Sequence, residues 1–573
     1  MLTLWGEQTD SSHVLPEYPR PQLQRNNYTI LNGLWDYAIT DTETIPDVWD
    51  GKILVPFSPE APLSGVNRTL QPGRYLWYRR TIRCRAGEGQ RLLLHFGAVD
   101  QIAAVFVNGT PVGGHTGGYT AFSLDITEEC TGEDELIVRV RDDSDQSPLS
   151  RGKQKTKRGG IWYTPQSGIW QTVWCETVPD AHITDLRIVP NYDRSRVEIT
   201  VCAGMDYPCH LEFAGDRFDG KTNAPIVVPV PDFLPWSPES PVLYPFTAVL
   251  GEDRAESYFA MRKVEVRKDE HGVPRIHLNG RPYFMHGVLD QGYWPDGLYT
   301  APSDEALILD IQSMKDMGFN MLRKHIKVEP MRWYYHCDRL GMLVWQDMMN
   351  GGAEEYKFLT ISAPLVTKMH RKDNSYAAFG REDEKGRKLY YKELTEMVRQ
   401  LRNVPSIVMW VPFNEGWGQF DAQKAVDLIR KLDPDRLIDH ASGWHDQGIG
   451  QLQSLHVYFV PYKFKPDRKG RAVVLSEYGG YNLMIPGHSW NEKNFGYRKL
   501  SDPEALLKAY EALMLEQILP AVEQGLSAAV YTQLSDVEDE VNGLWSYDRT
   551  VQKMPTAALR NINLQLTGGN QRR

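Results

Sequence analysis

Two glutamates stand at the ends of two strongly apolar runs. Glu415 follows the run VMWVPFN, and Glu477 follows the run AVVLS. Such runs are typical of strands covered on both faces, as in a parallel sheet flanked by helices, where a lone acid is least expected. In a closed parallel barrel the carboxyl ends of the strands form the open mouth. We therefore expect both acids to reach one pocket.

A pair of carboxyl groups around one small pocket has a specific chemical use. One group protonates the leaving oxygen of a glycosidic bond, while the other attacks the anomeric carbon or activates water. A single glutamate at a strand end is more often a loop or cap residue than a catalyst. The hypothesis of glycoside cleavage therefore rests on the pair, with Glu415 and Glu477 as the candidate catalytic residues.

The part of the chain that must position these acids alternates between strand and helix patterns. Eight strand candidates, from YFMHG to AAVYTQLSD, occupy roughly 290 residues, the usual size of a (β/α)8 TIM barrel. Glu415 ends the fourth candidate and Glu477 the seventh. A doubly wound sheet is the alternative, but no glycine-rich phosphate loop follows an early strand. The sequence predicts a catalytic barrel over residues 268–573.

Short β-rich runs fill the chain before the barrel. YLWYRRTI, RLLLHF and ELIVRV are divided by turn clusters, and LRIVPN and VEITVC continue the pattern. We predict a jelly-roll β-sandwich over residues 1–180 and a smaller immunoglobulin-like β-sandwich over residues 181–267. The expected fold class is therefore multidomain, with two sandwiches before a TIM barrel.

Composition narrows the classes of partner. The 573 residues carry a formal net charge of −10, which argues against nucleic acid or an anionic membrane as the main partner. No run of about 18 apolar residues and no basic N-terminal leader is present, so a cytoplasmic protein is expected. Six scattered cysteines without a CxxC pair argue against a zinc site. The basic run Lys153 to Arg158 is expected to be a solvated loop.

Several longer motifs occur in order along the chain. FGAVDQIAAVFVNG and SGIWQTVWCE lie in the first domain, and GFNMLRKH, RNVPSIVMWVPFNEGWG and LSEYGG lie in the barrel. With these motifs the chain resembles glycoside hydrolase family 2, the group of β-galactosidases, β-glucuronidases and β-mannosidases, over nearly its full length. The resemblance implies a retaining mechanism with Glu415 as acid/base and Glu477 as nucleophile.

The resemblance also implies roles for residues around the pair. Asn414 matches an asparagine that hydrogen-bonds the sugar 2-hydroxyl, and His325 a histidine that contacts the sugar. Arg323 matches an arginine that holds the nucleophile ionised, and Tyr458 a tyrosine that donates to it. A structural ion pair is the alternative for Arg323, and a core position is the alternative for Tyr458.

Further residues are candidates for contact with the sugar. The expected apolar platforms are Trp417, Trp444, His456 and Trp545. The loop after the first strand offers Asp290, Gln291, Trp294 and Asp296, whose acids and amides suit hydroxyl pairs. Tryptophans at strand ends also pack as core, and such a loop also serves as a cap on the barrel.

The expected sugar of the substrate is inferred from two family features that this sequence lacks. Relatives selective for glucuronides carry an Asn-x-Lys pair in the loop after the last strand, and here that loop reads VEDEVNGLW. The acid and histidine spacing that binds magnesium in large β-galactosidases is missing after the third strand. We expect no metal and no cofactor, a carbohydrate partner, and a β-galactoside as substrate; homo-oligomerisation stays open. The rivals are a β-glucuronidase or β-galacturonidase and, in another class, an inactive carbohydrate-binding protein.

Overall fold

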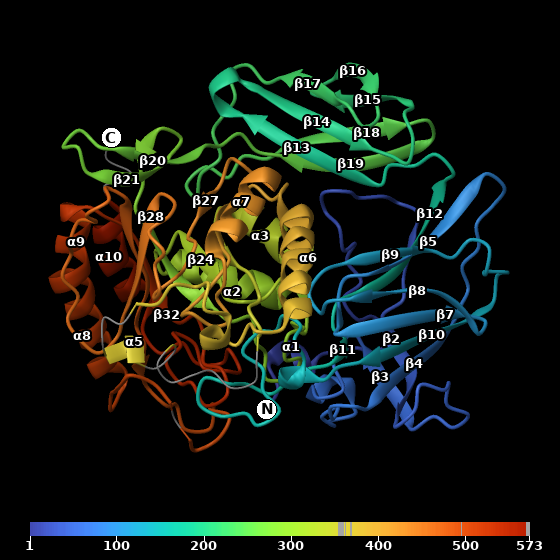
Figure 1. Ribbon diagram of the computed structural model, residues 1–573, viewed down its shortest axis with the longest axis horizontal. Helices are drawn as coiled ribbons and strands as arrows, with labels where there is room; N and C mark the ends of the chain where they lie inside the picture. The colour runs from blue at the N-terminus through green and yellow to red at the C-terminus, as the bar shows by residue number, and fades with distance from the viewer. Residues whose placement is uncertain (353–359, 361–362, 367–369, 494, 569–573) are drawn as a thin grey trace.

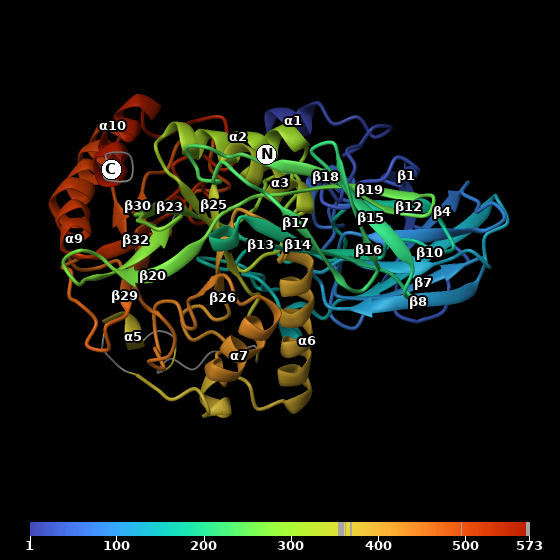
Figure 2. The ribbon, with the colours of Figure 1, turned by 90° about the horizontal axis from the view of Figure 1, so that it is seen from above.

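The computed structural model describes residues 1–352, 360, 363–366, 370–493 and 495–568. Figure 1 shows a barrel with helices in yellow-green to red, a sandwich of strands in blue to cyan beside it, and a second, green sandwich above both. Figure 2, seen from above, shows the second sandwich lying over the junction of the other two parts. This arrangement confirms the predicted multidomain fold class.

The first sandwich consists of a six-stranded sheet, in the order β3-β2-β4-β10-β7-β8, and a four-stranded sheet, in the order β1-β12-β5-β9. Apolar residues of both sheets, among them Leu94, Val105 and Val138, form its buried core. β6 and β11 form a separate pair. The strands are β1 (Tyr28–Ile30), β2 (Gly33–Thr40), β3 (Gly51–Val55), β4 (Tyr75–Ile82), β5 (Gln90–Phe96), β6 (Val99–Asp100), β7 (Ile102–Val107), β8 (Thr110–Thr116), β9 (Phe122–Asp125), β10 (Asp134–Arg141), β11 (Gly168–Ile169) and β12 (Val173–Pro179).

The second sandwich packs a three-stranded sheet, β13-β14-β17, on a four-stranded sheet, β16-β15-β18-β19. The inward residues of β14 alternate with less buried ones, as expected of a strand with one buried face. The strands are β13 (Asp185–Asn191), β14 (Arg196–Cys202), β15 (Pro208–Phe213), β16 (Asp216–Lys221), β17 (Pro225–Pro229), β18 (Tyr244–Leu250) and β19 (Asp253–Phe259).

A small antiparallel sheet joins the second sandwich to the barrel. It contains β20 (Val264–Lys268), β21 (Pro274–Leu278) and β22 (Arg281–Pro282). Ile276 and Leu278 share a core cluster with residues of the barrel strands. The expected boundary between residues 267 and 268 falls inside β20, and the domain limits stay a prediction.

Eight parallel strands form the nearly closed barrel, in the order β27-β26-β25-β24-β23-β32-β29-β28. Every residue of β25, β26 and β29 is buried, which explains their continuous apolar runs. The barrel confirms the predicted TIM-like fold. Its strands are β23 (Met285–Asp290), β24 (Met321–Lys324), β25 (Leu343–Asp347), β26 (Ile407–Val411), β27 (Leu437–Ile438), β28 (Leu452–Val457), β29 (Ala472–Gly479) and β32 (Leu526–Thr532).

Helix α6 (Glu384–Leu401) lies between the barrel and the first sandwich (Figure 1). One side of α6 contacts the first sandwich. Lys392 donates to the Thr116 carbonyl at 2.9 Å, and the Ala121 amide donates to Gln400 Oε1 at 2.9 Å. The other α-helices are α1 (Leu4–Glu7), α2 (Asp304–Asp316), α3 (Met331–Leu340), α5 (Ala363–Val366), α7 (Ala422–Leu432), α8 (Pro503–Leu513), α9 (Leu519–Gln524) and α10 (Thr556–Thr567).

Of the helices in the described part of the chain, none combines the length and the apolar character needed to cross a membrane.

Candidate active site

The two candidate glutamates lie together at the mouth of the barrel. Glu477 is a residue of β29, and Glu415 follows β26 in a turn where its amide donates to the Ser442 carbonyl at 2.9 Å. Glu415 has a left-handed φ of 51°, which is uncommon for a residue other than glycine and is frequent at functional sites. Both side chains are buried, and carboxylate oxygens of the two lie within 4.8 Å of each other.

Glu477 is held at both carboxylate oxygens. Arg323 donates from Nη1 to Oε1 at 3.1 Å, and the Tyr458 hydroxyl donates to Oε2 at 2.5 Å. The Tyr458 ring stacks on Tyr497 with centroids 3.8 Å apart, which fixes the position of the hydroxyl. Charge-assisted hydrogen bonds of this kind keep a carboxylate ionised and oriented.

Arg323 is completely buried and uses its remaining donors on two neighbours. Nε and Nη2 donate to the two oxygens of Asp347 at 3.0 Å each, and Nη2 also donates to Oδ1 of Asn414 at 2.9 Å. Because a guanidinium only donates, this contact determines which end of the amide is the oxygen. The Nδ2 group of Asn414 is buried and has no hydrogen-bond partner among the described residues. It is therefore available to a ligand.

His456 lies between the two glutamates. Its Nδ1 is 2.8 Å from Oε1 of Glu415 and 3.6 Å from Oε2 of Glu477, and its Nε2 is 3.0 Å from the Ser442 hydroxyl. Both ring nitrogens are thus engaged with polar groups. This position differs from the expected apolar platform, because the imidazole edge rather than its face meets the site.

The surroundings move the pKa values of the two glutamates apart. Burial raises the pKa of Glu415; the His456 hydrogen bond opposes the rise and the charge of Glu477 adds to it. Burial alone would also raise the pKa of Glu477, but the charges of His456 and Arg323 lower it to about 2. Two nearby carboxyl groups with divergent pKa values are the arrangement in which one acts as acid and the other stays ionised.

Comparison with known proteins identifies the barrel. Residues 265–479, which contain both glutamates, match the family model for the TIM barrel domain of glycosyl hydrolases family 2. The barrel of this chain therefore belongs to glycosyl hydrolase family 2. The predicted resemblance is thereby confirmed.

Proteins with different names are similar to this chain. A putative β-glucuronidase of Formosa agariphila is 26% identical over 400 residues, which cover 63% of this chain and 44% of that protein. A β-galactosidase of Thermoanaerobacter pseudethanolicus is 25% identical over 392 residues, which cover 63% and 47%. The chain spans about half the length of the curated relatives it matches.

Solved structures share the fold over nearly the whole chain. A β-D-glucuronidase of Dictyoglomus thermophilum has a TM-score of 0.73 at 16% identity, covering 96% of this chain and 98% of that one. A family 2 β-galacturonidase of Eisenbergiella tayi bound to galacturonate has a TM-score of 0.71 at 20% identity, covering 96% and 99%. The likeness extends over both sandwiches as well as the family 2 barrel.

Three more of the expected residues lie around the pair in this family 2 site. Nδ1 of His325 is 2.7 Å from Oδ2 of Asp347, and its ring centroid is 6.4 Å from that of Trp417. Burial lowers the pKa of His325 well below its usual value, so the ring is neutral. The Trp444 ring lies 6.2 Å from the His456 ring. Contact of these three side chains with a sugar stays a prediction.

The expected residues of the loop after the first strand are engaged in other contacts. Asp290 accepts from Lys324 Nζ at 2.6 Å, and Gln291 donates to Gln533 at 2.9 Å. Trp294 is buried and its ring lies 4.2 Å from the guanidinium carbon of Arg549. These contacts support the alternative in which the loop caps the barrel, and the sugar-binding role stays a prediction.

Two further candidates lie in contact with distant parts of the chain. The indole nitrogen of Trp545 donates to the Ser313 hydroxyl of α2 at 3.2 Å. This hydrogen bond ties the Trp545 side chain to a helix outside the barrel strands. Asp296 accepts from the amide and hydroxyl of Thr3 at 2.8 and 2.6 Å. Both pairings join residues more than 200 positions apart, so no local pattern could have indicated them.

The first sandwich contributes residues to the mouth that the sequence did not indicate. Lys153 is only 6% exposed, so the expectation of a solvated loop is wrong at this position. Trp162, in the same segment, packs against Trp417 with ring centroids 5.3 Å apart. Arg158 donates to Glu538 and Asp539 of the loop after β32 at 3.0 and 3.3 Å. The segment Lys153–Trp162 is therefore a wall of the barrel mouth.

The pair and His456 also have the spacing of a metal site, because one possible ligand atom from each lies within 4.8 Å of the others. The charge on Arg323, 3.1 Å from Glu477, would repel a cation there. The donor set therefore does not favour a metal, and the expectation of a metal-free site stays a prediction.

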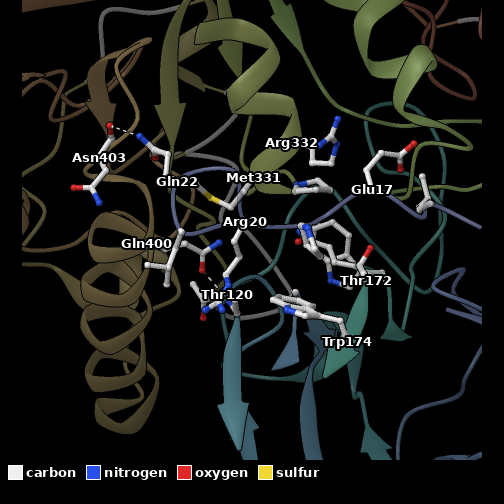
Figure 3. A pocket seen from close by; sticks show the side chains of 18 of the residues that line it. Glu17, Arg20, Gln22, Thr120, Thr172, Trp174, Met331, Arg332, Gln400 and Asn403 are labelled. Carbon is white, nitrogen blue, oxygen red and sulfur yellow. Dashed lines mark hydrogen bonds between the residues drawn. The ribbon is translucent and has the colours of Figure 1, made fainter. Parts of the chain in front are cut away.

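A cavity of about 370 Å³ lies at the junction of the three parts (Figure 3). Trp174, Leu186 and Met331 line it from the first sandwich, the second sandwich and the barrel. The Trp174 ring already packs against His95, 4.8 Å away, and Arg20, 5.5 Å away. Neither candidate glutamate lines this cavity, so it is distinct from the site at the barrel mouth.

Proposed function

We propose that the chain is an exo-acting retaining β-glycosidase, with Glu415 as acid/base and Glu477 as nucleophile. The separation of the two carboxylates, whose oxygens approach within 4.8 Å, carries the proposal. Retaining glycosidases place these groups about 5 to 5.5 Å apart, while inverting ones need about 6.5 to 9.5 Å to admit a water. The close approach of the two carboxylates supports the retaining arrangement over the inverting one.

The first step forms a glycosyl-enzyme. Ionised Glu477 attacks the anomeric carbon while protonated Glu415 gives its proton to the leaving oxygen. The low pKa of Glu477 and the raised pKa of Glu415 supply these two protonation states together. The Nδ2 group of Asn414 is the donor for the sugar 2-hydroxyl, because Arg323 already occupies the amide oxygen.

The second step releases the sugar. Burial still raises the pKa of Glu415, but once Glu477 is esterified its negative charge is gone, so the repulsion that added to the rise disappears. Glu415 then takes a proton from water, which attacks the anomeric carbon and frees Glu477. The Tyr458 hydroxyl, which donates to Oε2 of Glu477 in the free protein, is placed to stabilise the carboxylate as it is released. One carboxyl group thus serves as acid and then as base.

Exo action is supported by the walls of the mouth. The segment Lys153–Trp162 of the first sandwich reaches the barrel and contacts the loop after β32 through Arg158 and Glu538. A mouth closed on one side admits the end of a glycan rather than its middle. The relatives and structural neighbours are named as β-glucuronidases, β-galactosidases and β-galacturonidases. The β-galactoside expected from the sequence stays a prediction.

The rival from another class is an inactive carbohydrate-binding protein. The presence of both glutamates, oriented by Arg323, Tyr458 and His456, speaks against it. A panel of 4-nitrophenyl β-glycosides, with galactoside, glucuronide, galacturonide, mannoside and glucoside, tests the proposal with and without EDTA. Turnover that survives EDTA supports a metal-free glycosidase, and no turnover by the folded protein on any of them contradicts the proposal.

A further inference from the structure

Lys153 brings a buried positive charge from the first sandwich to the barrel mouth. Its side chain is 7% exposed. The amide of Tyr163 donates to the Lys153 carbonyl at 2.8 Å, which fixes the backbone of the segment. The ammonium lies 5.7 Å from the ring centroids of both Tyr163 and Trp417. It is therefore held between aromatic rings of two domains.

Within the described part of the chain, the Lys153 ammonium has no acceptor at ordinary hydrogen-bond distance. Among the described residues its ion-pair partner is Glu540, whose Oε2 lies 3.7 Å away. That same oxygen already accepts a hydrogen bond from the Tyr163 hydroxyl. An ammonium has three donors, and burying them without acceptors costs free energy. The ammonium can therefore donate to a ligand in addition to its long ion pair with Glu540.

Neighbouring buried cations differ from Lys153 in their hydrogen bonds to the protein. Lys324 donates to Asp290 at 2.6 Å and to Glu329 at 2.8 Å. Arg323 distributes its donors over Asp347, Asn414 and Glu477. These cations make short hydrogen bonds to protein acceptors, whereas the nearest described carboxylate oxygen to the Lys153 ammonium is 3.7 Å away.

Lys153 is also close to the catalytic pair. Trp417, which faces its ammonium, comes two residues after Glu415, and the Trp417 amide donates to the Asn414 carbonyl at 2.9 Å. The charge of Lys153 opposes the rise in the pKa of Glu415 and adds to the lowering of the pKa of Glu477. A sugar held between the two glutamates therefore lies within the field of this charge.

We propose that Lys153 binds the carboxylate of a uronic acid, so that the substrate is a β-linked hexuronide. A carboxylate offers two acceptor oxygens and the opposite charge, whereas a sugar hydroxyl offers one neutral acceptor. The inference rests on the proposed glycosidase function and replaces the β-galactoside expected from the sequence. That expectation relied on the missing Asn-x-Lys pair after the last strand and the missing magnesium-binding spacing, but Lys153 reaches the site from another domain.

The test compares wild type with Lys153→Met on 4-nitrophenyl β-glucuronide, β-galacturonide, β-galactoside and β-glucoside. We expect wild type to prefer a uronide. Lys153→Met should lower kcat/KM for that uronide by about 10- to 100-fold, the range of a hydrogen bond to a charged group, and change neutral glycosides less than about threefold. Lys153→Arg, which keeps the charge, should retain more uronide activity than Lys153→Met.

The matched control is Lys157→Met, which removes an exposed lysine from the same segment and should leave every rate unchanged. A wild type that prefers neutral glycosides, or an unchanged ratio of uronide to neutral rates in Lys153→Met, overturns the inference while the glycosidase proposal stands. If wild type turns over nothing, calorimetric titration decides. Binding of free galacturonate or glucuronate but not galactose, lost in a folded Lys153→Met, supports the inference, and no such binding overturns it.

Discussion

Nη2 of Arg323 donates to Oδ1 of Asn414 at 2.9 Å, and the same guanidinium donates from Nη1 to Glu477 at 3.1 Å. One buried cation thus orients the nucleophile and the amide beside it. Asn414 can therefore only donate to a sugar, because its amide oxygen is occupied and its Nδ2 group has no partner among the described residues. A contact with the 2-hydroxyl strengthens in the transition state of glycoside cleavage.

Replacing Asn414 should therefore cost activity only on substrates that have a 2-hydroxyl. Asn414→Ala is expected to lower kcat/KM by about 10- to 100-fold on the parent aryl glycoside, as for a buried hydrogen bond that acts in the transition state. On the 2-deoxy glycoside the same variant should differ little from wild type, since the partner is already missing. An equal loss on both substrates would mean that Asn414 acts by supporting the fold.

Glu477→Gln should abolish turnover while preserving the structure. The amide keeps the size of the side chain but cannot form the glycosyl-enzyme, so we expect kcat to fall by about 10⁴-fold or more. The measurement is steady-state hydrolysis together with a thermal unfolding curve. Recovery of full activity in a folded Glu477→Gln protein would remove the nucleophile assignment.

Glu415→Ala should separate the two chemical steps. Aryl glycosides with good leaving groups need little proton donation, so their first step should persist and the glycosyl-enzyme should accumulate as a burst. Azide, an anion that needs no general base, should then restore turnover and yield a β-glycosyl azide. Glu477→Gln serves as the control, because azide attacking without a glycosyl-enzyme would give the α product.

The pH dependence should follow the two displaced pKa values. The acid limb of kcat/KM reflects protonation of Glu477, whose pKa is lowered to about 2. The alkaline limb reflects loss of the proton from Glu415, whose pKa is raised. His456 lowers the pKa of both groups. His456→Asn should therefore move both limbs of the profile to higher pH. A loss of rate without any shift would show that His456 only supports the packing.

The barrel and the two acids could be predicted because their signals are local. Each buried strand is a short apolar run, and each acid breaks such a run at its carboxyl end, as at Glu415 after Val411. The family motifs supplied Arg323 and Tyr458 through neighbouring letters, and the structure places both on Glu477. Short-range patterns were sufficient at these positions.

Residues whose surroundings come from distant parts of the chain could not be predicted in this way. Lys153 occurs in a run of basic residues typical of a solvated loop, and only the docking of the first sandwich on the barrel buries it. The aromatic ring of Trp545 would suit a sugar platform, but its indole nitrogen donates to Ser313 on α2. His456 follows an apolar pattern, yet its ring nitrogens meet Glu415 and Ser442. In each case the deciding neighbour is distant in sequence.

The most direct test of the two-carboxylate mechanism is to trap the covalent intermediate. The enzyme would be incubated with the 2-deoxy-2-fluoro derivative of whichever aryl glycoside it hydrolyses best, digested, and examined by peptide mass spectrometry. The account predicts one added fluorosugar on the peptide that contains Glu477, at Glu477 itself, and no label in Glu477→Gln. A label on Glu415 or another residue, or an unlabelled enzyme that releases sugar with inverted anomeric configuration, would contradict it.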